Sequence, residues 1–265
     1  MRPGDWRVLP TTGWNNGAIL EPCSPSNIVE YADSASWDPV SRQVLFVGSP
    51  HGSCYGSRFV VYRDADNSWR TEPLPPGVPE DGTGPPPYFS HAYHHNTIDP
   101  ATGQAFFIEY GGLIVHRYDT NGTRAWDTHS RIPLPRGSAS CCRALEYFPH
   151  LGGLVYVDGT EGIWVYRTSA GRWRQLADTA LVHDPALPRL QMGAYDNVAE
   201  YNPVRGVLLF GGGRGGGRIC LCDGRCGHHH AQPGRACRPA RRIGLQPQQR
   251  RSHQCRYLFF DDDGT

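Results

Sequence analysis

Four short segments of the chain repeat one plan at intervals of about fifty residues. Each segment has a turn in which Asp, Asn or Phe precedes Pro, then a short polar link, then four apolar residues that end near a glycine. The residues before Pro are Asp38, Asp99, Phe148 and Asn202, so the steps between them are 61, 49 and 54 residues. A repeat of this length predicts a chain that is built from blade-sized units.

The four apolar runs predict strands that are buried on both faces. They read VLFV from Val44, AFFI from Ala105, LVYV from Leu154 and VLLF from Val207, with no polar residue between the apolar ones. A strand that has one face in water would alternate apolar and polar residues instead. Burying one such side chain stabilises a fold by roughly 1.5–3 kcal/mol. A single sheet, however, cannot cover both of its own faces. We therefore expect each unit to pack between two neighbours.

A Tyr and a Trp follow three of the apolar runs at a nearly constant spacing. The pairs are Tyr62 with Trp69, Tyr118 with Trp126, and Tyr166 with Trp173, which are seven, eight and seven residues apart. The residues between them are rich in Asp, Asn, Ser and Gly and favour a tight reversal between antiparallel strands. Each unit is therefore predicted to have four strands, and the recurring Trp is predicted to be a packing residue. The expected fold is all-β, a β-propeller of four-stranded antiparallel blades whose ring closure hides sheet edges.

These units resemble the kelch-type β-propeller repeat, which also forms the central domain of galactose-oxidase-like proteins. The matching features are the sequence LLFGGG that begins at Leu208, the Tyr-to-Trp spacing, and the LPR sequence that follows the last strand of a unit. Together they cover residues 28–213. About four blades and the start of a fifth are recognisable, which is consistent with a fragment of a six- or seven-bladed ring. The resemblance implies a non-enzymatic binding scaffold for protein or carbohydrate ligands.

The composition changes abruptly after Gly213. Residues 214–256 hold ten Arg, five Cys and four His with Asp223 as the single acid, so this segment carries +9, while the rest carries 16 − 24 = −8. At Tyr257 the buried-strand pattern resumes. We therefore divide the chain into propeller blades at 1–213, an anomalous segment at 214–256 and the start of a further blade at 257–265. A pair of compensating reading-frame shifts in GC-rich DNA would explain the middle segment, and so would a disordered insertion.

A metal-binding insertion is a third explanation for this segment. Thiolates and imidazoles suit zinc, and the segment offers Cys220, Cys222, Cys226, Cys237 and His228–His230. The cysteine spacing nevertheless lacks the paired C-x2-C units of zinc fingers. The sequence thus predicts no cofactor, with zinc as an alternative.

The charge and the start of the chain bear on partners and compartment. The net charge of +1 indicates no nucleic-acid partner, and no apolar run approaches the roughly 20 residues of a membrane-spanning helix. The opening MRPGDWRVLP lacks the apolar core of a signal peptide. It is similar to the outer-strand exits, so it is either a ring-closing strand or the continuation of a missing upstream part. The sequence leaves the compartment and the oligomeric state open.

The repeat alignment also indicates a candidate ligand site. Four different polar residues lie five positions before the turn residue of each unit: Asp33, His94, Arg143 and Asn197. Because inner strands of a propeller meet at the central channel, these side chains are predicted to line it and to bind a ligand through hydrogen bonds. The alternative is that they hydrate the channel and tie the blades together.

A second function is implied by the galactose-oxidase resemblance. Tyr93 and His94 are similar to the Tyr-His pair of copper-radical oxidases that act on alcohols or sugars, where a second His and a Cys-crosslinked Tyr complete the copper site. Only these two residues can be carried over to this chain. The sequence has no Gly-x-Ser-x-Gly elbow, P-loop or His-Glu-x-x-His motif. No catalytic residue is assigned, and an enzyme is not the favoured expectation.

Overall fold

Almost all regular secondary structure of the described residues is β-strand. The computed structural model describes residues 8–20, 27–29, 32, 34–49, 56–77, 92–135, 142–177, 195, 197–212 and 218–223. Helical structure in these residues is limited to two single turns, η1 (Asn16–Leu20) and η2 (Pro149–Leu151). No helix in the described ranges is long and apolar enough to cross a membrane.

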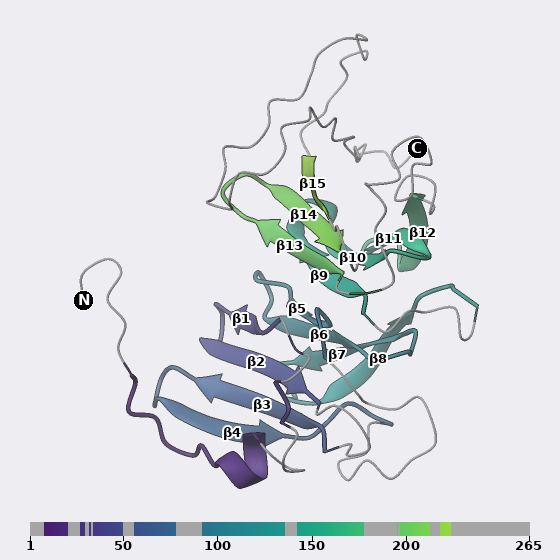
Figure 1. The fold of residues 1–265 in the computed structure, drawn as a ribbon. Coiled ribbons are helices and arrows are strands. Elements are labelled where there is room, and N and C mark those ends of the chain that lie inside the picture. Colours follow the sequence, from purple (N-terminus) through teal and green to yellow (C-terminus); the bar gives the residue numbers. More distant parts are fainter. Residues whose placement is uncertain are drawn as a thin grey trace, which may run out of the picture.

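The strands form separate antiparallel sheets that follow one another along the chain (Figure 1). Blade one contains β1 (Ser36–Asp38), β2 (Gln43–Gly48), β3 (Arg58–Arg63) and β4 (Ser68–Glu72). Blade two contains β5 (Asn96–Ile98), β6 (Gln104–Ile108), β7 (Ile114–Asp119) and β8 (Trp126–Arg131). Blade three contains β9 (Ala144–Phe148), β10 (Gly153–Asp158), β11 (Gly162–Arg167) and β12 (Arg172–Ala177). Blade four has three described strands, β13 (Val198–Asn202), β14 (Val207–Gly212) and β15 (Arg218–Asp223).

The first strands of successive blades adjoin one another. Figure 1 shows β1, β5, β9 and β13 gathered in the middle of the molecule, with the outer strands β4, β8 and β12 at its periphery. Isolated parallel bridges join Ala32 to Tyr93 and His94 to Ala144, and so connect blade one to blade two and blade two to blade three. This arrangement of four-stranded antiparallel blades around a common centre is that of a β-propeller, which confirms the predicted fold class.

The second strand of each blade carries the buried apolar run, as predicted. Every residue of β10 is buried, and β6 is buried from Ala105 to Ile108. In β2, Leu45 and Val47 are buried while Val44 and Phe46 are only partly so, because blade one has a blade on one side only among the described residues. Burial on both faces thus follows from packing between blades.

The predicted Tyr–Trp pairs are direct cross-strand partners. Tyr62 lies opposite Trp69, Tyr118 opposite Trp126, and Tyr166 opposite Trp173. Their ring centroids are 4.9, 5.1 and 5.4 Å apart, within the range of favourable aromatic contacts.

Two of these Trp side chains also reach back to the preceding blade. Trp126 of blade two donates its indole N–H to the carbonyl of Pro73 at 2.8 Å and packs on Phe59 of blade one. Trp173 of blade three donates to the Ser130 hydroxyl of blade two at 3.1 Å. The recurring Trp therefore packs the blades against one another, which explains why it repeats with the blade.

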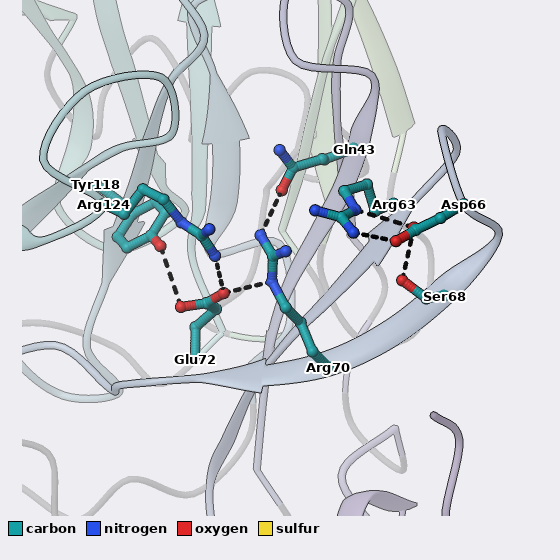
Figure 2. A network of polar contacts seen from close by, with 8 residues as sticks. All are labelled: Gln43, Arg63, Asp66, Ser68, Arg70, Glu72, Tyr118 and Arg124. Atoms are coloured by element: carbon teal, nitrogen blue, oxygen red, sulfur yellow. Dashed lines mark hydrogen bonds and ion pairs between the residues drawn. The ribbon is translucent and has the colours of Figure 1, made fainter. Parts of the chain in front are cut away.

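A polar network joins the outer strand of blade one to β7 and the β7–β8 turn of blade two (Figure 2). The Glu72 carboxylate forms ion pairs with Arg70 of its own strand and with Arg124 of blade two. It also accepts a long hydrogen bond, 3.5 Å, from the Tyr118 hydroxyl of β7. Arg70 in turn donates to the Gln43 side chain at 3.1 Å, so the network spans blade one from β2 to β4.

The described part of the N-terminal segment lies beside the outer strand of blade one. Thr12 bridges Ser68 of β4 in parallel, and Trp69 donates its backbone N–H to the Thr12 carbonyl at 2.8 Å. Trp14 packs edge-on against Trp69 at 5.0 Å. Residues 1–7, which hold most of the predicted strand exit, lie outside the described residues.

The last described strand, β15, falls within the anomalous segment 214–256 and pairs with β14. Cys220 and Cys222 belong to this strand. The other proposed zinc ligands, Cys226, His228–His230 and Cys237, lie outside the described residues. The further blade at 257–265 also lies outside them. The domain boundaries, the origin of the segment and its zinc alternative stay predictions.

Candidate functional site: a pocket among the inner strands

The inner strands of all four blades line one pocket of about 370 Å³. Its walls come from β1, β5, β9 and β13 and from the turn prolines Pro100 and Pro203. The volume lies in the range of about 300–1,000 Å³ that is typical of small-molecule sites. Because several repeats contribute to this pocket, we take it as the candidate ligand site.

Aromatic side chains form one part of the pocket wall. Trp37, Tyr147 and Tyr201 occupy the position directly before the turn residue in blades one, three and four. Trp37 is 45% exposed, which is unusual for a large apolar side chain on a strand. Tyr147 stacks on Phe106 at 6.1 Å, and Tyr201 packs on Phe148 at 5.7 Å, so both rings are held by neighbouring aromatics. These side chains offer flat apolar faces next to polar groups.

Glu146 lies in the polar part of the wall and is held from both neighbouring blades. Its Oε2 accepts a hydrogen bond from the Thr97 hydroxyl of β5 at 2.8 Å. Its Oε1 accepts one from the backbone N–H of Tyr201 in β13 at 3.1 Å. Burial raises the pKa of Glu146 to about 8, and the nearby charge of Glu200 adds to this, while the two hydrogen bonds act in the opposite direction.

Glu200 and His94 complete the polar part of the pocket. The Glu200 side chain is 67% exposed and its carboxylate lies 3.8 Å from His94 Nε2, too far for a hydrogen bond. Partial desolvation raises the pKa of Glu200. Burial lowers the pKa of His94 to about 4, so its imidazole is neutral at pH 7 and does not form an ion pair with Glu200.

The predicted site residues that the structure describes differ in their hydrogen-bond partners and in whether they line the pocket. His94 is 3% exposed and lines the pocket. Arg143 is fully buried, and its guanidinium donates to the Glu109 carbonyl of blade two at 2.5 Å and to the Tyr156 hydroxyl at 3.3 Å. The Asn197 side chain donates to the Cys142 carbonyl at 2.7 Å. Asp33 lies outside the described residues.

The backbone does bring the repeat-equivalent positions together. Leu145, two residues after Arg143 in blade three, donates its N–H to the His94 carbonyl at 2.8 Å, and Asn197 donates its N–H to the Cys142 carbonyl at 2.9 Å. Each of these positions therefore lies where one blade meets the next. The contacts described for Arg143 and Asn197 join blades, and their predicted role in ligand binding stays a prediction.

The pocket residues two positions before the turn are not among the site residues that were predicted from the sequence. In the four units these are Ser36, Thr97, Glu146 and Glu200. The same alignment that gave His94 contains this position, and all four residues there are polar. Polar residues at an inner-strand position of every blade are the signal that could have identified them.

A larger cavity of about 710 Å³ lies at the outer edge of blade one, next to the N-terminal segment. Its charged lining includes Arg70 and Glu72, which already belong to the inter-blade network of Figure 2. We place the candidate site at the smaller pocket because its polar groups come from four blades and face a common space.

The raised pKa of Glu146 makes stability depend on pH. Between its unfolded pKa near 4.5 and about 8 the folded state holds a proton that the unfolded state has lost. The free energy of unfolding is therefore expected to fall as pH rises through this window, by about 1.4 kcal/mol per pH unit at most. Urea unfolding from pH 5 to 9 would show this decline, and Glu146→Gln should remove it.

A companion variant tests the cause of this pH dependence. Glu200→Gln removes a charge that raises the pKa of Glu146, so the decline should end at lower pH. A Glu146→Gln protein whose stability follows the same pH curve as the unaltered chain would contradict the assignment.

The residues around Tyr93 and His94 bear on the copper alternative. Among the described ranges, no three His, Cys, Asp or Glu side chains are close enough together to hold a metal ion. Tyr93 accepts a hydrogen bond at its backbone carbonyl from Ser34, and its ring lies 6.1 Å from that of His95. A copper site that is built from both Tyr and His side chains at Tyr93 and His94 stays a prediction.

No protein-family model matches the sequence, and no curated protein matches it. Similar solved structures include TolB from Acinetobacter baumannii, with 10% identity, a TM-score of 0.45, and coverage of 72% of this chain and 40% of TolB.

Two similar structures are enzymes by their descriptions. A fungal alcohol oxidase of the AA5 family, in complex with copper, has 13% identity and a TM-score of 0.42, and the match covers 71% of this chain and 40% of the oxidase. The GH74 enzyme from Niastella koreensis has 12% identity and a TM-score of 0.48, with coverage of 78% and 30%. The chain thus spans less than half the length of these three structures.

Proposed function

We propose that the chain is a kelch-like propeller that acts as a binding scaffold, and that its central pocket binds a carbohydrate. The observation that carries the proposal is the pairing of exposed or partly exposed aromatic rings with hydrogen-bonding groups in one pocket. The kelch assignment is supported by the Tyr–Trp cross-strand pairs and by the Gly211–Gly212 ending of β14.

As a ligand, a carbohydrate fits the residues of this pocket better than a flat surface of another protein would. A sugar ring has an apolar face of C–H groups that can pack on Trp37 or Tyr201, and hydroxyls that both donate and accept hydrogen bonds. Thr97 and the carboxyls of Glu146 and Glu200 can pair with such hydroxyls. A site with a few placed polar groups among apolar ones is the usual form of a small-ligand pocket.

Replacing Trp37 with alanine tests the proposal. Burying one aromatic side chain contributes roughly 1.5–3 kcal/mol, so we expect binding to weaken about 10- to 150-fold. Isothermal titration calorimetry with a panel of neutral oligosaccharides measures the change. Trp14 is a matched control because it is 40% exposed and does not line the pocket.

The outcomes separate the candidate functions. Equal weakening by Trp14→Ala and Trp37→Ala would contradict the assignment of the pocket. If the chain binds a protein and none of the sugars displaces that protein, the result would support a protein ligand instead. Copper uptake with peroxide formation from an alcohol would support the oxidase alternative.

A further inference from the structure

The pocket contains two carboxyl groups in different surroundings. Glu146 is enclosed between Thr97 of blade two and the backbone of Tyr201 in blade four. Glu200 occupies the equivalent position of the next blade, and its side chain is largely exposed. Both line the same pocket as the aromatic rings.

We propose that the pocket hydrolyses a glycosidic bond of its carbohydrate ligand, with Glu146 as general acid and Glu200 as general base. This inference rests on the proposed carbohydrate binding and goes beyond the non-enzymatic role that the sequence predicts. Inverting glycoside hydrolysis uses one carboxyl group that keeps its proton and one that takes a proton from water. Groups that are held in unlike environments can divide these tasks.

The surroundings of each residue fit its role. Burial raises the pKa of Glu146 to about 8, so at pH 7 most of this group carries a proton that it can donate. The Glu200 side chain is largely exposed, and partial desolvation raises its pKa, which makes it a stronger base. His94, neutral at pH 7, places no positive charge beside Glu200 that would weaken that base.

The reaction balances with water as the only co-reactant. The bond between the anomeric carbon and the glycosidic oxygen breaks, and that oxygen takes the Glu146 proton and leaves as a hydroxyl. A water molecule forms the new bond to the anomeric carbon, and its proton goes to Glu200. Solvent then returns a proton to Glu146 and removes one from Glu200, so neither residue is changed.

The aromatic rings would hold the sugar during this reaction. Trp37 and Tyr201 belong to blades one and four, whereas Thr97 and Glu146 belong to blades two and three. A ring that packs on the aromatics is thereby positioned beside the carboxyls. Such positioning converts the attack of water into a step within one complex.

The test uses the full chain with cellotetraose, xylotetraose, mannotetraose and laminaritetraose as probes. Binding is measured by calorimetry, and cleavage is measured by the release of new reducing ends. We expect the chain to cleave a probe that it binds. Glu146→Gln and Glu200→Gln should each lower kcat at least about 100-fold, while affinity stays within a factor of about three.

A second substrate separates the acid role of Glu146 from a structural one. A 4-nitrophenyl glycoside has a leaving group that departs without a proton. Glu146→Gln should therefore slow its cleavage much less than that of the oligosaccharide, whereas Glu200→Gln should slow both. Glu161→Gln, a carboxyl of blade three outside the pocket, is the control that keeps full activity.

The outcomes distinguish this inference from the proposed function. Probes that bind in a Trp37-dependent manner but are never cleaved would overturn hydrolysis and leave carbohydrate binding standing. Failure to bind any probe would overturn both. Cleavage that persists in both Gln variants would show that Glu146 and Glu200 do not perform it.

Discussion

Replacing Arg143 with methionine is expected to lower the free energy of unfolding by about 3–5 kcal/mol. The guanidinium is fully buried, and it donates to the Glu109 carbonyl and to the Tyr156 hydroxyl. The Tyr156 hydroxyl in turn donates to the buried Asp158 carboxylate at 2.7 Å. Methionine fills a similar volume but leaves the carbonyl without this donor and the carboxylate without the nearby positive charge.

Urea unfolding at pH 7 would measure this loss, with Arg172→Met as the matched control. Arg172 belongs to the same blade but is exposed, and a surface substitution of this kind changes stability by about 0.5 kcal/mol or less. Equal effects at both positions would contradict a structural role for Arg143.

Replacing Arg143 with lysine separates its charge from its shape. Lysine keeps the positive charge but has one nitrogen, whereas the arginine uses two nitrogens to reach Glu109 and Tyr156. We expect lysine to recover only part of the loss. Full recovery would mean that the charge alone matters, and that the two directed hydrogen bonds contribute little.

The fold could be predicted because its determinants repeat along the chain. Consecutive apolar residues required burial on both faces, and the spacing of Tyr118 and Trp126 placed them across a hairpin, as observed. Both signals depend on residues close together in sequence. The side-by-side packing of the blades follows from these signals, since a blade that is buried on two faces must pack between two others.

The site could be predicted only as a position in each blade. The alignment placed His94 and Arg143 at equivalent inner-strand positions, and their backbones do lie where blades meet. The direction of each side chain depends on partners far away in sequence, such as Glu109, 34 residues before Arg143. Glu146 likewise depends on Thr97 and on the Tyr201 backbone, each about fifty residues away. No local pattern contains those contacts.

Replacing Gly103 with alanine is expected to destabilise the protein by about 2–5 kcal/mol. Its φ of +74° costs an L-residue about 1–2 kcal/mol. A Cβ there would also collide with Asn121 Nδ2 and lie 2.9 Å from both carboxylate oxygens of Asp38. Crowding of this kind adds about 1–3 kcal/mol, because Asp38 is fully buried and accepts a hydrogen bond from Thr120 at 2.7 Å.

Gly152 provides the control because it occupies the equivalent turn of blade three. Its φ is +57°, but a Cβ there would meet nothing within 4 Å. Gly152→Ala should therefore carry only the backbone cost, and urea unfolding should show a smaller loss than for Gly103→Ala. The difference between the two variants measures how tightly the Asp38 carboxylate of blade one fits against the turn of blade two. Equal losses would mean that Asp38 and Asn121 move aside freely, and that this contact between blades is loose.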